Sequence, residues 1–128
     1  MLNSDMRSAT ATAPFRLPAS PAPSDLVAKY FRALGDANRL RMLDELLGAG
    51  ELSVGELVER VGVAQPKVSN HLACLRWCGF VETRRQHRSV YYRIADDRIA
   101  EIVALGRALL ADNAEHVAAC CAIDGGGR

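Results

Sequence analysis

The sequence predicts a mainly α-helical fold with one small β-hairpin, in the order α-α-α-α-β-β-α. Three observations support this fold class. Apolar residues recur at the spacing of an amphipathic helix in four segments before residue 79 and in one segment after residue 96. Capping residues, prolines and glycines separate these segments where helices begin and end. The β-branched and aromatic segments 80–85 and 89–94 have the character of two paired strands.

The length and composition are those of one domain with two tails. The chain has 128 residues, 49% of them hydrophobic, which is adequate for one ordinary core. We expect a disordered N-terminal tail over 1–24, a folded domain over 25–118 and a flexible C-terminal tail over 119–128. No apolar run is long enough to span a membrane and no secretory leader is apparent, so we expect a cytoplasmic protein.

The first two helices are predicted from their ends. Ser24 or Asp25 can cap a first helix that runs to about Leu34. Asp36 then caps a second helix, in which leucines recur at helical spacing, and Gly48 and Gly50 close it.

The third and fourth helices predict a helix-turn-helix. Ser53 and Glu56 have the spacing of a capping box, which opens a short helix to about Val61. After the tight turn 62–64, Pro66 suits the first turn of the next helix, where its missing N–H costs nothing. Two helices joined by such a short turn are typical of a helix-turn-helix, whose second helix enters the major groove of DNA.

The rest of the domain completes a winged helix-turn-helix. The two predicted strands are joined by the polar and basic turn 86–88, and a basic hairpin in this place is a wing that can lie along the phosphate backbone. A long last helix is expected from Asp96 or Asp97 to about Ala118, with Gly106 allowing close approach of another helix.

Basic charge is concentrated on the predicted DNA-binding elements. Residues 65–93 hold six Lys and Arg residues and one Glu, a balance of +5, on a chain whose net charge is +1. Amide side chains can read adenine, lysine can bind guanine or phosphate, and wing arginines suit phosphates. The candidate DNA-binding residues are Gln65, Lys67, Ser69, Asn70, His71, Arg84, Arg85, His87 and Arg88.

Some of these residues have alternative roles. His71 is equally expected to be a half-buried packing residue, and Asn70 can cap or brace the motif instead. Trp77, a lone aromatic residue, is expected to pack inside the fold.

The four cysteines form two pairs, Cys74 with Cys78 and Cys120 with Cys121. In a cytoplasmic chain they are thiols, metal ligands or redox sensors rather than a disulfide framework. Residues i and i+4 share one helix face, with Cβ atoms about 5–6 Å apart. Two thiolates can therefore bind one soft ion, such as Cd(II), Pb(II), Hg(II) or competing Zn(II).

Three alternatives stay open for these thiols: core packing, oxidant or persulfide sensing, and arsenite binding by three sulfurs. The spacing is not the Cys-x-x-Cys of redox enzymes, and no catalytic arrangement is apparent, so we expect no enzyme.

The order of elements and three segments resemble the ArsR/SmtB family of winged-helix, metal-responsive repressors. The match covers about residues 26–118, and the segments 31–43, 65–72 and 88–93 carry it. The resemblance implies a transcriptional repressor that forms a homodimer through its first and last helices. It also implies binding to double-stranded, two-fold-symmetric operator DNA and release of that DNA on binding a metal.

Members of this family sense metals at different places. Arsenic-type members have cysteines where this chain has Ser53 and Gly55, so that site is absent. Zinc-type members use Asp and His along the last helix, which offers only acidic residues and a histidine at one end: Asp112, Glu115 and His116.

The segment 72–79 resembles the cadmium- and lead-sensing CmtR-like branch, in which two cysteines at this spacing join a C-terminal cysteine. The resemblance implies that Cys74, Cys78 and either Cys120 or Cys121 bind Cd(II) or Pb(II), with Hg(II), Zn(II) and As(III) as alternatives. The choice between the two adjacent tail cysteines stays open.

Overall fold

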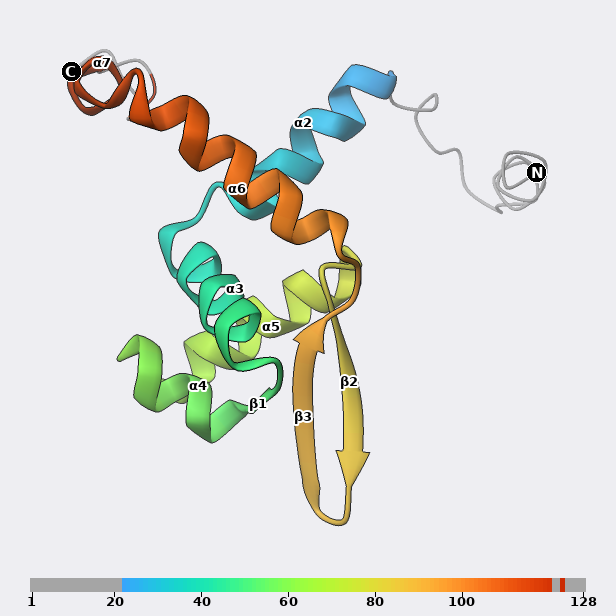
Figure 1. The fold of residues 1–128 in the computed structure, drawn as a ribbon. Helices are drawn as coiled ribbons and strands as arrows, with labels where there is room; N and C mark the ends of the chain where they lie inside the picture. Colours follow the sequence, from blue (N-terminus) through green and yellow to red (C-terminus); the bar gives the residue numbers. More distant parts are fainter. Residues whose placement is uncertain (1–21, 121–122, 124–128) are drawn as a thin grey trace. The chain divides into compact units, whose positions relative to one another are not determined.

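The computed structural model describes residues 22–120 and 123 (Figure 1). The chain divides into two units, residues 1–32 and 33–128. In the first unit the described residues form most of helix α2, Pro23–Leu34. This helix begins one or two residues before the predicted capping residue, because proline fits the first turn of a helix. Nearly all of the predicted N-terminal tail lies outside the described residues.

The second unit confirms the predicted mainly helical fold with a hairpin before its last two helices. Its elements are α3 (Ala37–Ala49), β1 (Leu52–Ser53), α4 (Val54–Val61), α5 (Gln65–Trp77), β2 (Val81–Gln86), β3 (Ser89–Ile94), α6 (Arg98–Ala111) and α7 (Ala114–Ala119). None of the helices in the described part of the chain has the length and apolar content needed to cross a bilayer.

The helix ends follow the local sequence. The side chain of Asp36 accepts a hydrogen bond from the backbone N–H of Arg39 at 3.0 Å, which caps α3. Ser53 and Glu56 form the predicted capping box of α4, with hydrogen bonds of 3.2 Å and 2.8 Å. Gly62 ends α4 at φ 69°, a left-handed conformation that glycine adopts without the steric cost of a Cβ atom.

Two predictions for the last helix and the strands need correction. The long last helix is interrupted, since α6 ends at Ala111 and α7 begins at Ala114. The side chain of Asn113 donates to the carbonyl of Leu109 at 3.1 Å, and such local bonds compete with the helical backbone pattern. The strand β1 was not predicted, because two residues are too few to show a strand pattern.

The three strands form an antiparallel sheet in the order β1-β3-β2. In the hairpin, Val81 pairs with Ile94, and Gln86 pairs with Ser89 beside the turn. Strand β1 adds Leu52 opposite Tyr92. Figure 1 shows β2 and β3 projecting beyond the helices α3, α4 and α5 as a long arm, which is the geometry expected of a wing.

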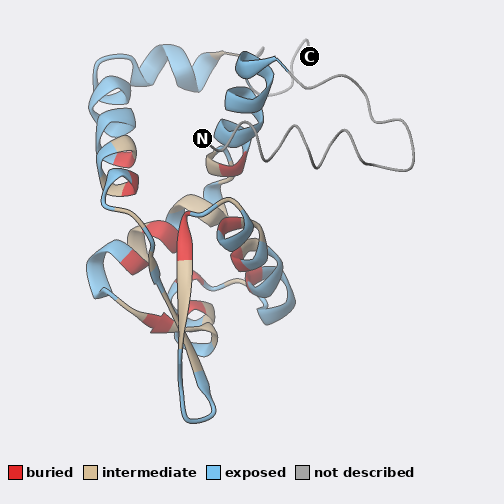
Figure 2. Ribbon diagram, turned by 90° about the vertical axis from the view of Figure 1, so that its right-hand side faces the viewer, coloured by how far each residue is buried: buried red, intermediate tan, exposed pale blue. Residues whose placement is uncertain are grey.

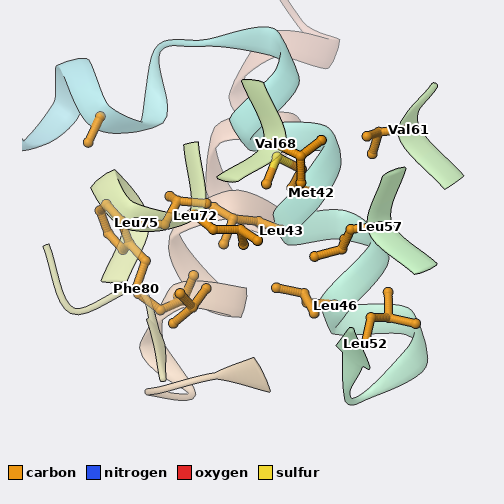
Figure 3. Packing of buried hydrophobic residues seen from close by; sticks show 13 residues of the cluster. Met42, Leu43, Leu46, Leu52, Leu57, Val61, Val68, Leu72, Leu75 and Phe80 are labelled. Atoms are coloured by element: carbon orange, nitrogen blue, oxygen red, sulfur yellow. The ribbon is translucent and has the colours of Figure 1, made fainter. Parts of the chain in front are cut away.

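The core lies where α3, α4 and α5 meet the base of the hairpin (Figure 2). Leu43 of α3 and Leu72 of α5 are fully buried and point toward the same centre in Figure 3. Phe80, just before β2, is also fully buried and lies beside Leu75. Burying side chains of this size contributes about 1.5–3 kcal/mol each, so this cluster holds α5 firmly against α3 and α4.

Candidate functional site

Helix α5 is buried along one side and exposed to solvent along the other. Its buried side chains, Val68, Leu72 and Leu75, recur at helical spacing and face the core. The first half of the helix has exposed side chains on the opposite side. Four of the predicted DNA-binding residues lie there: Gln65, Lys67, Ser69 and Asn70. A rigid helix with exposed polar side chains is what major-groove readout requires.

His71 differs from these four residues because its side chain is only 15% exposed. Its Nδ1 lies 3.3 Å from Nη1 of Arg39, and its Nε2 lies 3.9 Å from Oδ1 of Asp36. Arginine can only donate, so Nδ1 accepts this hydrogen bond and the neutral ring carries its proton on Nε2. These contacts match the packing alternative and tie α5 to the first turn of α3.

The same corner contains a carboxylate held in its charged form. The backbone hydrogen bond from Arg39 is the main cause that lowers the pKa of Asp36; burial opposes it, and the charge of Arg39 lowers the pKa further. Asp36 therefore serves as a helix cap and as a charged partner for residues of two helices. The sequence signalled only the capping role.

The wing carries four of the predicted DNA-binding residues. Arg85, His87 and Arg88 are exposed around the turn of the hairpin, where His87 has φ 56°. Arg84 is half-buried, and its guanidinium donates to both carboxylate oxygens of Glu51, at 2.7 Å and 2.8 Å. The structure thus places three of these side chains in solvent and one in an intramolecular ion pair.

Cys74 and Cys78 lie at the other end of α5. Helix α5 ends at Trp77, so Cys78 is the residue that follows it, yet its backbone N–H still donates to the carbonyl of Cys74 at 3.0 Å. This bond keeps the two residues one helical turn apart. Both are free cysteines, half-buried and packed against the core.

The tail cysteines are only partly described. Cys120 is half-buried and follows directly after α7, whereas Cys121 lies outside the described residues. Within residues 22–120 and 123 of one chain, no group of three or more His, Cys, Asp and Glu side chains is arranged to hold a metal ion. Among the described cysteines, Cys74 and Cys78 lie one helical turn apart, and Cys120 lies after α7. Asp112, Glu115 and His116 are all exposed around the break between α6 and α7.

The expectation that Trp77 packs inside the fold is wrong for the described chain. Trp77 is 92% exposed, because it points away from the side of α5 that carries the buried leucines. Sequence reasoning also missed Arg39 and Glu51, the partners of His71 and Arg84. Neither has a local signal, since each contact joins residues more than 30 positions apart.

The chain is similar in sequence to known regulators. A family model described as bacterial regulatory protein, arsR family, matches residues 36–83, which include all of α4 and α5. The chain is 44% identical over 104 residues to a probable mercury resistance operon repressor of Streptomyces lividans, an alignment that covers 81% of this chain and 82% of the relative. It is 42% identical over 80 residues to the HTH-type transcriptional regulator CmtR of Mycobacterium bovis, with 62% of this chain and 65% of the relative covered.

A solved structure has a similar fold. The homodimeric winged helix-turn-helix DNA-binding domain Mb0332 of Mycobacterium bovis, described as a possible ArsR-family transcriptional regulator, is similar to this chain with a TM-score of 0.65 at 31% identity. The similarity covers 77% of this chain and 95% of the solved chain.

Proposed function

The chain belongs to the arsR family of bacterial regulatory proteins, and we propose that it represses transcription as a homodimer released from operator DNA by a soft thiophilic ion, Cd(II) or Pb(II). The family consists of DNA-binding regulators and not of enzymes. One observation supports the proposal: the helix that exposes polar side chains at its first turns has Cys74 in its last turn and Cys78 directly after its end.

DNA binding is assigned to α5 and to the wing. Gln65, Lys67, Ser69 and Asn70 are the candidates for contacts in the major groove, because they are exposed on the first half of α5. The exposed basic residues Arg85 and Arg88 are candidates for phosphate contacts, which contribute affinity but little sequence preference. The contacts of His71 support a role in holding α5 in place.

A homodimer is supported by apolar side chains that the described chain leaves in solvent. Helix α2 exposes Leu26, Val27, Tyr30 and Phe31, each at least 40%. Helix α6 exposes Leu105, Leu109 and Leu110, each at least 45%. Single exposed apolar residues are ordinary, but helices with several of them are typical of interaction surfaces. We therefore assign dimerisation to the first and last helices.

The ligand set is two thiolates of α5 with a third sulfur from a C-terminal tail. Thiolate sulfur is the donor that soft ions prefer, and residues one helical turn apart can share an ion without distorting the helix. Since one described chain supplies two sulfurs in this place, the third is assigned to Cys120 or Cys121 of either subunit. When bound, the ion supplies a link between α5 and a tail.

The dimer releases DNA if this link moves its two α5 helices relative to each other. Their separation must match one turn of DNA, about 34 Å, so a small displacement weakens both half-sites together. A coupling free energy of about 1–3 kcal/mol, typical of allosteric proteins, changes DNA affinity about 5- to 150-fold.

A second candidate effector is Hg(II). Two observations favour it: a relative 44% identical is named a probable mercury resistance operon repressor, and Hg(II) forms stable complexes with only two thiolates. The pair Cys74 and Cys78 alone would then suffice, without a tail cysteine.

Titration of the protein–DNA complex with each ion separately tests the proposal. Cd(II), Pb(II), Hg(II), Zn(II) and As(III) are added to the complex while fluorescence anisotropy of labelled DNA reports release. Release by Cd(II) or Pb(II) with a thiolate-to-metal absorption band is expected. Release only by peroxide or polysulfide, with loss of free thiols and no such band, would instead identify an oxidant or persulfide sensor.

The same titration tests whether a tail cysteine is a ligand of the ion. In a variant with Cys120→Ser and Cys121→Ser, we expect weaker release by Cd(II), because a ligand is missing. Unchanged Cd(II) affinity and unchanged DNA release would remove the tail from the mechanism and leave the α5 pair as the complete site.

A further inference from the structure

The side chain of Arg84 crosses the wing sheet from one edge strand to the other. Arg84 is on β2, Glu51 directly precedes β1, and β3 lies between these strands. The guanidinium Nε donates to Oε2 of Glu51 at 2.8 Å, and Nη2 donates to Oε1 at 2.7 Å. Such a two-point pair between planar groups is stronger and more directional than a single hydrogen bond.

Two further contacts hold the guanidinium in this position. Tyr91, the cross-strand partner of Arg84 on β3, has its ring centroid 5.1 Å from the guanidinium carbon, within the range of a cation–π contact. The remaining terminal nitrogen, Nη1, donates to Oε1 of Gln86 at 2.7 Å. All three guanidinium nitrogens therefore have acceptors within the chain.

The electrostatics of the pair agree with its geometry. The hydrogen bond from Arg84 lowers the pKa of Glu51, and the hydrogen bond to Glu51 raises the pKa of Arg84. The side chain of Glu51 is 28% exposed and that of Arg84 is 39% exposed, so the pair is partly shielded from solvent. At neutral pH both groups are charged and their interaction is internal to the wing.

Arg85 and Arg88 differ from Arg84 because their side chains are exposed. Side chains of neighbouring residues in a strand point to opposite faces of the sheet, so Arg85 faces away from the side that carries Arg84. Both Arg85 and Arg88 are exposed, and neither forms an ion pair or side-chain hydrogen bond with the part of the chain that the structure describes. Their charges are available to a phosphate without breaking an existing interaction.

We propose that Arg84 is a positioning residue, which together with Glu51 fixes the wing to β1, and that Arg85 and Arg88 make the phosphate contacts of the wing. This inference rests on the proposed function, because it assumes that the wing contacts DNA. It differs from the expectation from sequence that all the wing arginines bind phosphates. Arg84 supports DNA binding by setting the angle of the hairpin and not by neutralising a phosphate.

The salt dependence of DNA binding separates the two roles. The slope of log affinity against log salt concentration falls by about 0.9 for each phosphate that the protein no longer neutralises, and non-specific duplex binding contains essentially only this term. The probe is a fluorescein-labelled duplex of mixed sequence, with anisotropy measured between about 50 and 200 mM KCl. We expect Arg85→Ala and Arg88→Ala each to lower the slope by about 0.9, and Arg84→Ala to leave it unchanged while weakening affinity about two- to fivefold.

Glu51 gives a test in which the two roles predict opposite signs. Glu51→Gln removes the partner of Arg84 without changing side-chain size. If Arg84 positions the wing, binding weakens; if Arg84 is a phosphate ligand, the released guanidinium strengthens binding. The exchanged variant Glu51→Arg with Arg84→Glu restores the pair, and we expect it to bind more tightly than Arg84→Glu alone.

The outcomes are distinguishable. A slope decrease for Arg84→Ala equal to that of Arg85→Ala, stronger binding by Glu51→Gln, or no recovery in the exchanged variant would each overturn the positioning role. Unchanged slopes for both Arg85→Ala and Arg88→Ala would instead show that the wing does not contact DNA, which contradicts the proposed function. If Arg84→Ala does not fold, Arg84→Gln, which removes the charge but keeps a hydrogen-bonding side chain, gives the same slope comparison.

Discussion

Replacing Cys74 or Cys78 by alanine separates the two roles open to these thiols, packing and ion binding. Each side chain is half-buried against the core, and the substitution removes one sulfur atom. A buried methylene contributes about 0.8 kcal/mol, so a loss of about 1 kcal/mol in unfolding free energy is expected for each variant. A domain with a stability of about 5–15 kcal/mol stays folded after such a loss.

Ion binding adds a much larger effect. At a free ion concentration about 100 times the dissociation constant, binding stabilises the folded state by about 2.7 kcal/mol. For a domain of this size, 1 kcal/mol shifts the melting temperature by about 4–8 °C, so Cd(II) should raise it by about 10–20 °C in the original chain. We expect most of this rise to disappear in each alanine variant.

Circular dichroism melts at one fixed protein concentration, with and without Cd(II), measure both effects. Ala73→Ser is a matched control, because Ala73 is exposed on the same turn and is not a thiol. If Cys74→Ala and Cys78→Ala retain the full cadmium-induced rise, the two thiols are packing residues and the reasoning about an ion site on α5 is refuted.

Three further predictions concern the fold and the DNA-binding face. Leu72→Ala, at a fully buried position, should lower the unfolding free energy by about 3–5 kcal/mol in a urea titration, and a loss below about 1 kcal/mol would contradict the core packing. Asp36→Ala should cost about 1 kcal/mol through loss of the α3 cap. Because folding lowers the pKa of Asp36, this carboxylate contributes fully to the unfolding free energy above its ordinary pKa of about 4. The contribution is lost as the pH falls through the lower pKa of the folded state. Urea titrations at several pH values should therefore show that the stability difference between the original chain and Asp36→Ala decreases at acidic pH. Lys67→Ala should weaken operator binding measured by anisotropy. If Lys67 binds a phosphate, the salt slope should be lower by about 0.9. If Lys67 binds guanine, the slope should be unchanged and the preference for guanine at that position should be weaker.

Features set by neighbouring residues were predictable from the sequence. The caps at Asp36 and Ser53 depend on side chains within three positions, and the structure contains both. The left-handed turn at Gly62 and the hairpin strands also follow from local residue preferences. The one-turn spacing of Cys74 and Cys78 also followed from the local sequence, and the structure keeps it through the backbone bond from Cys78 to Cys74.

Features set by distant residues were not predictable. The two-residue strand β1 exists because β3 offers it a pairing edge. The contact of His71 with Arg39 and the pair of Arg84 with Glu51 depend on how α3 and the sheet pack, which no local pattern encodes. Trp77 illustrates the opposite error, since its size favoured burial while its place on α5 left it in solvent.

The most direct test uses the protein–DNA complex with both thiols of α5 replaced by serine. The variant with Cys74→Ser and Cys78→Ser should bind DNA with nearly the original affinity, because neither residue lies on the DNA-binding half of α5. Added Cd(II), Pb(II) or Hg(II) should then no longer release the DNA, whereas the same ions release the original chain. Release of the double variant at the original ion concentrations would contradict the assignment of the sensing site to this helix.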